Sequence, residues 1–157
     1  MESCLVRYPN RQSLPHDMPL GIASEEATFF ITICAAARGS DDLLRDGRAA
    51  ALLEAVRHRH ENGFWWCRVF VVMPDHVHGL IRFPLLEHPM THEILEFKKF
   101  TARTLGIRWQ RDFFDHRLRR EESEREKADY ILRNPERAGL VEDWQKWPHV
   151  FVAPEGF

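Results

Sequence analysis

The sequence has no apolar run approaching the roughly 20 residues that a membrane-spanning helix needs. Its first residues, MESCLVRYPNRQ, lack the apolar segment that a signal peptide carries. Its three cysteines, Cys4, Cys34 and Cys67, are widely scattered, which predicts neither a disulfide framework nor a zinc-ribbon site. We therefore expect a soluble protein of the reducing cytoplasm that does not act at a membrane.

The sequence also lacks the excess of basic residues that is typical of proteins acting on nucleic acid, because its net charge is −2 over 157 residues. From Phe97 to Arg120, however, eight basic residues stand against two acidic ones, a local net charge of +6. Within this stretch, Lys98, Lys99 and Arg103 are candidate contacts to DNA phosphates. A solvated helix face would explain the same residues equally well.

Two kinds of hydrophobic pattern alternate along the chain after an irregular lead-in over residues 1–26, where proline is frequent. Runs rich in β-branched and aromatic residues predict strands over 28–35, 64–73 and 76–83, and a fourth short strand within 107–118. Apolar residues at helical spacing predict helices over 42–60, from a Thr91 cap to Leu105, and over 121–133.

The order β-α-β-β-α-β, followed by a further helix, is that of a ferredoxin-like α+β sandwich with an antiparallel sheet. We expect one domain over 27–157, in which strands 64–73 and 76–83 form a hairpin. The first two helices would cover one face of the sheet and leave the other face open for a substrate or partner. The aromatic segment after Gly139 would pack as a C-terminal tail.

A pair of histidines begins the third predicted strand. In an extended strand, residues two apart point to the same face, so His76 and His78 would lie side by side while Val77 points into a core. Two neutral imidazoles on a strand are half of a metal site. Polar residues at a strand surface would show the same spacing, and Asp75 would then simply cap the turn.

The last predicted helix offers two further polar groups on one face, Tyr130 and Asn134, which are related as i and i+4. The Asn134 amide oxygen, two imidazoles and water would make a mixed nitrogen and oxygen site suited to Mg²⁺ or Mn²⁺ at a phosphate. Two plainer interpretations remain: Tyr130 packs on an amphipathic helix, and Asn134 caps a turn with Pro135 at the first helical position.

Several segments resemble a known family. MPDHVHGL (73–80) looks like the histidine–hydrophobe–histidine (HUH) motif of single-strand DNA nucleases, and ADYILRNPERAGLV (128–141) with WQKWP (144–148) resembles the C-terminal signature of bacterial REP-associated tyrosine transposases. Those enzymes are part of the wider group of single-tyrosine HUH transposases. WQRDFFDHRLR (109–119) and LPH (14–16) are similar to other segments of that family.

By this resemblance, Tyr130 matches the catalytic nucleophile, His76 and His78 match two metal ligands, and Asn134 matches a third. The resemblance implies a metal-dependent endonuclease and strand transferase for single-stranded or hairpin DNA, active in DNA transposition and recombination through a covalent phosphotyrosine. Mg²⁺ or Mn²⁺ would be the cofactor, the helix after the sandwich would carry the nucleophile, and the enzyme would be a monomer or a homodimer.

Two other functions remain open at this point. The first is a DNA-hairpin-binding regulator that keeps the fold but does not cleave, against which the intact set of histidines and tyrosine argues. The second is a ferredoxin-like metalloprotein unrelated to DNA, such as a small hydrolase.

Overall fold

The computed structural model describes residues 26–119 and 122–154. Its strands are β1 (Glu26–Cys34), β2 (Trp66–Val72), β3 (His76–Pro84), β4 (Phe114–Arg117) and β5 (Val150–Val152). Its helices are α1 (Arg48–Glu61), α2 (Met90–Leu105), α3 (Glu124–Leu132) and the single turn α4 (Asn134–Arg137), and two 3-10 turns, η1 (Asp42–Leu44) and η2 (Trp144–Lys146), complete the elements. The predicted lead-in, with its LPH segment, lies outside the described residues except for Glu26.

The five strands form one antiparallel sheet in the order β4-β1-β3-β2-β5. The first four strands, in the order β4-β1-β3-β2, with α1 and α2 connecting them, confirm the predicted ferredoxin-like sandwich. Strand β5 extends the sheet beyond β2, where the sequence predicted only a packed tail. Three residues between turn-forming segments are too few for a recognisable alternating pattern.

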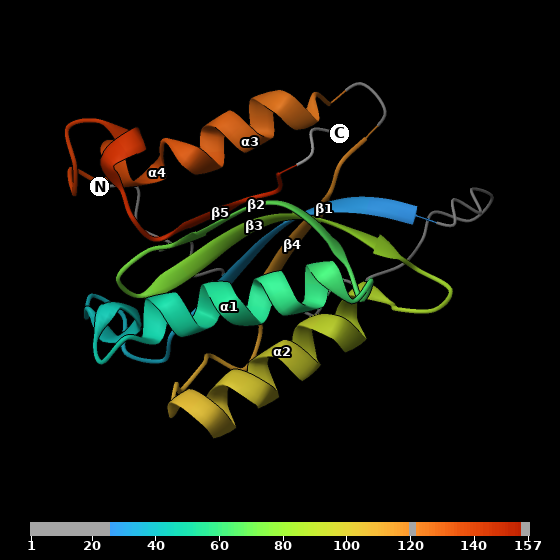
Figure 1. Cartoon of the computed structure of the whole chain (residues 1–157), viewed down its shortest axis with the longest axis horizontal. Helices are drawn as coiled ribbons and strands as arrows, with labels where there is room; N and C mark the ends of the chain where they lie inside the picture. Colours follow the sequence, from blue (N-terminus) through green and yellow to red (C-terminus); the bar gives the residue numbers. More distant parts are fainter. Residues whose placement is uncertain (1–25, 120–121, 155–157) are drawn as a thin grey trace, which may run out of the picture.

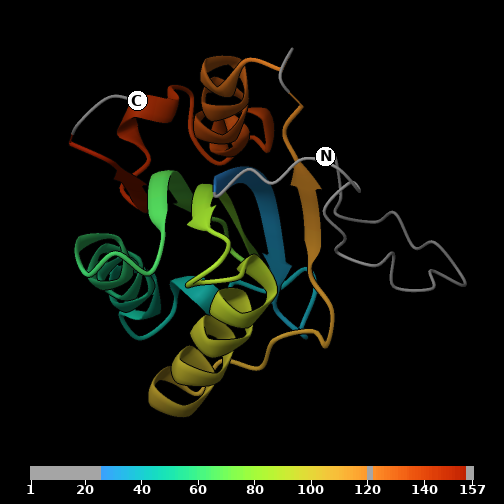
Figure 2. The same cartoon turned by 90° about the vertical axis from the view of Figure 1, so that its right-hand side faces the viewer.

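Helices cover both faces of the sheet (Figures 1 and 2). Helices α1 and α2 lie on one face, and α3 packs against β2 and β3 on the other. The prediction that the second face stays open was therefore wrong, because α3 has an apolar stripe, including Ala128 and Ile131, that must be buried. That stripe covers Val69, Val71 and Leu80.

The two faces have separate hydrophobic cores. The larger core, between the sheet and α1 and α2, contains Val77, Ile81 and Phe83 of β3, whereas Leu80 belongs to the smaller core under α3. Alternation along β3 therefore sends Val77 to the α1–α2 side, as the sequence predicted. No helix within the described part of the chain is long and apolar enough to cross a bilayer.

Three predicted helix boundaries were wrong for local reasons. The helix expected over 42–60 is divided, since Arg45 is extended after the 3-10 turn and Gly47, directly before α1, adopts the left-handed φ of 71°. Helix α2 begins at Met90 after Pro89, so Thr91 is inside the helix and does not cap it. Helix α3 begins at Glu124, where the Ser123 hydroxyl accepts a hydrogen bond from the Glu126 N–H.

Because Gly79 has no side chain, an aromatic ring of the larger core can pack directly against its backbone. Gly79 pairs with Phe70 on β2, and a Cβ atom at Gly79 would lie 2.9 Å from Cδ2 of Phe70 and 3.2 Å from Cδ1 of Ile81. The Phe70 ring in turn lies edge-on to Phe97 of α2, with ring centroids 6.0 Å apart. The residue directly after His78 is thus kept small by core packing.

We expect Gly79→Ala to lower the free energy of unfolding by about 1–3 kcal/mol, because the added methyl group forces the Phe70 ring or the strand to move. Urea denaturation measures this loss. In a Phe70→Leu background the smaller side chain leaves room for the methyl group, so the loss from Gly79→Ala should shrink. Equal losses in both backgrounds would contradict the steric explanation.

Candidate functional site

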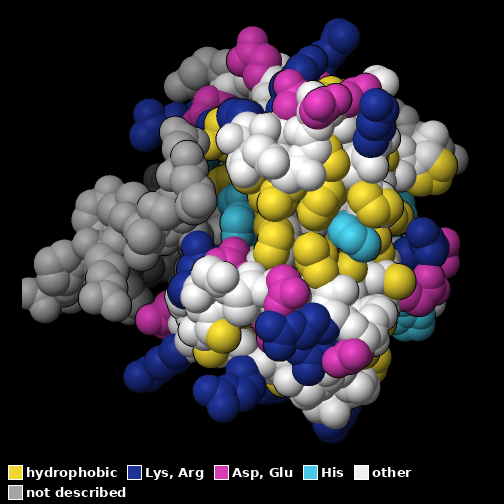
Figure 3. Space-filling model, turned by 90° about the vertical axis from the view of Figure 1, so that its left-hand side faces the viewer, with side chains coloured by type: hydrophobic (Ala, Val, Ile, Leu, Met, Phe, Trp, Pro, Cys, Tyr) yellow, Lys and Arg dark blue, Asp and Glu magenta, His cyan; other side chains and the backbone are white. Residues whose placement is uncertain are grey.

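His76 and His78 point to the α3 face of β3, and their rings converge. The two Nε2 atoms lie 3.1 Å apart, and the ring centroids are 4.7 Å apart. The strand sets this arrangement, since residues two apart share a face and Val77 between them is fully buried on the opposite side. Figure 3 shows the end of the molecule at which β3 begins, where histidine side chains lie beside and within a hydrophobic area between the helix layers.

The other nitrogen of each ring is held by a neighbour. Nδ1 of His78 lies 2.8 Å from Oγ1 of Thr32, which is directly opposite it on β1, and Nδ1 of His76 lies 2.7 Å from Oδ1 of Asp75. The Asp75 carboxylate is itself fixed, because it accepts a hydrogen bond from the Gly39 N–H and forms an ion pair with Arg38. Thr32 and Asp75 therefore fix the orientation of the two imidazoles through their Nδ1 atoms.

The environment favours a neutral His78 and an ionised Asp75. Burial holds the pKa of His78 well below its usual 6.5, and electrostatic interactions with His76, Arg137 and Arg38 act in the same direction. Burial alone would raise the pKa of Asp75, but hydrogen bonds from His76 and Gly39 and the charge of Arg38 together lower it. Metal binding requires a neutral imidazole as ligand, and a carboxylate that contacts a ligand histidine supports it. His78 and Asp75 are in these protonation states.

This geometry fits a metal ion. Two ligand atoms about 2.1 Å from one ion, at a right angle, are about 3.0 Å apart, close to the 3.1 Å between the two Nε2 atoms. Among the described residues, no third His, Cys, Asp or Glu completes a cluster around the pair. A metal held here would therefore need an uncharged protein oxygen, water or a substrate phosphate for its remaining positions, which is typical of an open site.

Tyr130 lies on the same face of the sheet, and Phe30 of β1 connects it to the histidines. The Phe30 ring stacks on His78 with centroids 5.4 Å apart and meets the Tyr130 ring edge-on at 6.3 Å. Tyr130 is 44% exposed, so part of this residue is accessible from solvent. The tertiary structure thus brings together a strand histidine and a helix tyrosine that are 52 residues apart.

Arg137, on the turn α4, holds Tyr130 from the other side. Its guanidinium carbon lies 3.8 Å from the centroid of the Tyr130 ring, and its Nη2 donates a hydrogen bond to the Tyr130 carbonyl at 2.7 Å. The positive charge of Arg137 also acts on His78. The tyrosine, the histidine pair and a guanidinium therefore occupy one end of the α3 face.

Asn134 begins α4 rather than continuing α3. Helix α3 ends at Leu132, Arg133 is the residue that caps both helices, and Pro135 occupies the first turn of α4. Asn134 is half-buried, and it does not cap the turn through its side chain. Within the described residues, no hydrogen bond joins its amide to either imidazole, so its predicted role as a third ligand stays a prediction.

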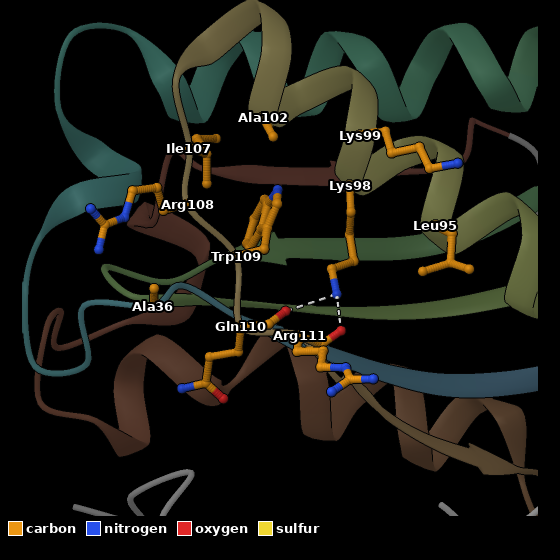
Figure 4. A pocket seen from close by; sticks show the side chains of 10 residues that line it. All are labelled: Ala36, Leu95, Lys98, Lys99, Ala102, Ile107, Arg108, Trp109, Gln110 and Arg111. Atoms are coloured by element: carbon orange, nitrogen blue, oxygen red, sulfur yellow. Dashed lines mark hydrogen bonds between the residues drawn. The ribbon is translucent and has the colours of Figure 1, made fainter.

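The three predicted DNA contacts lie on α2, across the sheet from the histidines. Lys98 is buried, and its ammonium donates to the carbonyls of Gln110 and Arg111, both at 2.8 Å (Figure 4). Burial lowers the pKa of Lys98. Lys99 is exposed and pairs with Glu96 at 2.9 Å.

Arg103 is exposed in the last turn of α2. The structure therefore does not bring the lysines and Arg103 together with Tyr130, and their predicted contact with DNA would require the nucleic acid to reach a second face. Lys98 in particular serves as a tether between α2 and the segment that leads to β4.

Comparisons with known proteins agree with the motifs. No protein-family model matches the chain. The REP-associated tyrosine transposase of Escherichia coli (strain K12) is 31% identical over 81 residues, and the putative REP-associated tyrosine transposase of Haemophilus influenzae is 30% identical over 95 residues. Each match covers 50% of this chain, with 49% and 53% of the relative covered, so the chain spans about half the length of these curated relatives.

A solved structure described as that of a REP-associated tyrosine transposase bound to a REP hairpin superimposes with a TM-score of 0.68 and 27% sequence identity. The match covers 79% of this chain and 75% of that chain. This chain resembles REP-associated tyrosine transposases in sequence and in fold. The resemblance inferred from the HUH and DYI-x-x-NP segments is thereby confirmed.

Sequence reasoning missed three residues of the site. Phe30 shares its strand face with Thr32, so alternation along β1 could have grouped them, but their position opposite β3 depends on the strand register. Arg137 carried a signal, since it lies seven residues, about two helical turns, after Tyr130. The proline between them hid that relation, because it predicted an end to the helix.

Lys98→Met is expected to lower the free energy of unfolding by about 1–3 kcal/mol, because it removes two charge-assisted hydrogen bonds to backbone carbonyls. Lys99→Met is the matched control and should stay within about 0.5 kcal/mol of the parent, since its side chain is exposed. Urea denaturation gives both values. Unchanged stability of Lys98→Met together with weakened binding to single-stranded DNA would instead identify Lys98 as a phosphate contact.

Proposed function

We propose that this chain is a metal-dependent single-stranded DNA endonuclease and strand transferase of the REP-associated tyrosine transposase type. It would nick hairpin-flanked DNA through a covalent phosphotyrosine at Tyr130. One observation carries the proposal. On one face of the sheet, Phe30 contacts both the exposed Tyr130 and His78, whose Nε2 atom converges with that of His76. The similarity to a protein described as bound to a REP hairpin supports DNA as the substrate.

In this proposal, each residue does one task. The Tyr130 oxygen attacks the scissile phosphorus and loses its proton to solvent, the bond from phosphorus to the 3′ oxygen breaks, and that oxygen leaves as a 3′-hydroxyl after taking up a proton. A phenol has a pKa of about 10 and is a weak nucleophile near neutral pH, so the phosphate needs activation. Mg²⁺ or Mn²⁺ held by Nε2 of His76 and His78 would draw charge from the phosphate oxygens.

The surrounding residues keep this arrangement fixed. Thr32 and Asp75 hold the histidine rings, Phe30 fixes the spacing between His78 and Tyr130, and α3 fixes the height of the tyrosine above the sheet. Preorganisation of this kind lowers the barrier because little needs to move when the phosphate arrives. The phosphotyrosine retains the energy of the broken bond, so attack by a second 3′-hydroxyl would rejoin strands.

A hairpin-binding regulator that does not cleave is the alternative. The site geometry argues against it, because a protein that only binds DNA has no need for two converging imidazoles held at both nitrogens. Tight binding of hairpin DNA without cleavage in Mg²⁺ or Mn²⁺ would nevertheless favour the regulator.

Tyr130→Phe should abolish covalent attachment to DNA and leave folding and DNA affinity unchanged, because it removes a single oxygen atom and keeps the aromatic ring. The measurement is a denaturing gel with end-labelled single-stranded hairpin DNA, in Mg²⁺ or Mn²⁺ and in chelator. Tyr8→Phe, which alters the other tyrosine of the chain, is the matched control and should retain the adduct. A protease-sensitive adduct that persists in Tyr130→Phe would overturn the assignment of the nucleophile.

Asp75→Asn should weaken Mn²⁺ binding roughly 10- to 100-fold, because the carboxylate that orients His76 and increases its basicity is lost. Titration of the free Mn²⁺ signal by electron paramagnetic resonance measures the affinity without any DNA. Asp41→Asn, which changes an exposed carboxylate that pairs with Arg45, should bind Mn²⁺ like the parent. If Asp75→Asn folds and binds Mn²⁺ as tightly as the parent, Asp75 only stabilises the turn.

A further inference from the structure

Arg137 contacts both the backbone and the side chain of a single residue, Tyr130. Its Nη2 donates to the Tyr130 carbonyl at 2.7 Å while its guanidinium carbon lies 3.8 Å from the ring centroid. The bond to the carbonyl anchors the guanidinium, so the flat cation lies against the aromatic face next to the phenol. A phosphate that reached the phenol from this face of the ring would therefore meet the arginine.

Arg137 differs in its charge balance from four other arginines of the described chain. Those arginines have carboxylate partners: Arg38 pairs with Asp75, Arg68 and Arg82 both reach Glu124, and Arg133 reaches Glu136. In the described part of the chain, no carboxylate lies within ion-pair distance of the Arg137 guanidinium. Among the residues that the structure describes, the tyrosine ring and one carbonyl dipole are the groups that face its positive charge.

A guanidinium without a carboxylate partner among the described residues is suited to bind a phosphodiester. It has five N–H donors in a plane, and Nη2 uses one of them on the Tyr130 carbonyl, so other donors remain for oxygen atoms of a phosphate. Contacts from arginine to phosphate are charge-assisted and directional, whereas a lysine at the same place would act only as a point charge. The same side chain can hold the ring and bind the phosphate without moving its anchor.

We propose that Arg137 is a catalytic residue that binds a non-bridging oxygen of the scissile phosphate while it positions the Tyr130 ring for attack. The inference rests on the proposed function, because it assigns a role in the same strand cleavage. Negative charge grows on the phosphate oxygens as the Tyr130 oxygen bonds to phosphorus and the bond to the 3′ oxygen breaks. A fixed cation beside those oxygens stabilises that charge.

The first part of the test compares Arg137→Ala, Arg137→Lys and the matched control Arg133→Ala, all as the full chain. Arg133 is also exposed, lies four residues earlier and packs over the Trp144 ring at 6.0 Å. With saturating single-stranded hairpin DNA and Mn²⁺, the rate of adduct formation should fall on the order of 100-fold in Arg137→Ala. It should fall less in Arg137→Lys and stay within about twofold of the parent in Arg133→Ala.

The second part separates phosphate binding from a structural role. A methylphosphonate at the scissile position replaces one charged non-bridging oxygen with a neutral methyl group, so the substrate no longer needs the arginine there. In one of the two diastereomers, the rate difference between the parent and Arg137→Ala should shrink from about 100-fold to a few fold. DNA affinity is measured separately in a Tyr130→Phe background and should change little with Arg137→Ala.

The outcomes distinguish this inference from the proposed function. An equal loss in Arg137→Ala on the phosphodiester and on both methylphosphonates would overturn the inference, since the arginine would then only shape α4, while cleavage by Tyr130 would stand. An unchanged adduct rate in Arg137→Ala would overturn it in the same way. No adduct with the parent protein on any hairpin substrate, despite binding, would overturn the proposed function and the inference together.

Discussion

The register between β1 and β3 is the constraint on which the site depends. It places Thr32 opposite His78 and Phe30 opposite Leu80, so a hydroxyl reaches one imidazole nitrogen and an aromatic ring covers the same imidazole. A shift of one residue would turn every side chain of β1 to the other face of the sheet. The cost would be large, because Ile31 and Ile33 would leave the larger core. The core on one face therefore fixes the site on the other.

The site also depends on the second layer that α3 adds to the sheet. Ala128 and Ile131 bury the helix against β2 and β3, and the exposed side of the same helix presents Tyr130. The apolar stripe that holds the helix and the residue proposed as nucleophile lie within four positions of each other, so helix packing sets the position of the phenol closely. A tyrosine on a loop would not be fixed in this way.

The position of individual basic residues matters more for this protein than its net charge. The net charge is −2, and the predicted basic stretch turns out to be divided, since Lys98 ties α2 to the segment before β4 and Lys99 pairs on the helix surface. The proposed contact to phosphate comes instead from Arg137, on the turn α4 after α3, where no run of basic residues marks it. A single cation placed beside the reacting group acts more strongly than several dispersed over a distant face.

The sequence by itself determined the first four strands, the presence of three main helices, the ferredoxin-like order and the common face of His76 and His78. Alternation and helical spacing are local properties of the chain, so they can be recognised without knowledge of the fold. The motifs also indicated Tyr130, through a resemblance that the comparisons confirm.

Only the tertiary structure decided which groups meet. Phe30 joins His78 to Tyr130, α3 covers the face expected to be open, and Lys98 faces away from the histidines. Each of these facts depends on strand register or on the packing of one layer against another. The two ring contacts of Phe30, for example, join residues 48 and 100 positions apart. The physical reason is that tertiary contacts depend on how the whole chain buries its apolar surface. A sequence pattern, in contrast, reflects only interactions between residues close together in the chain.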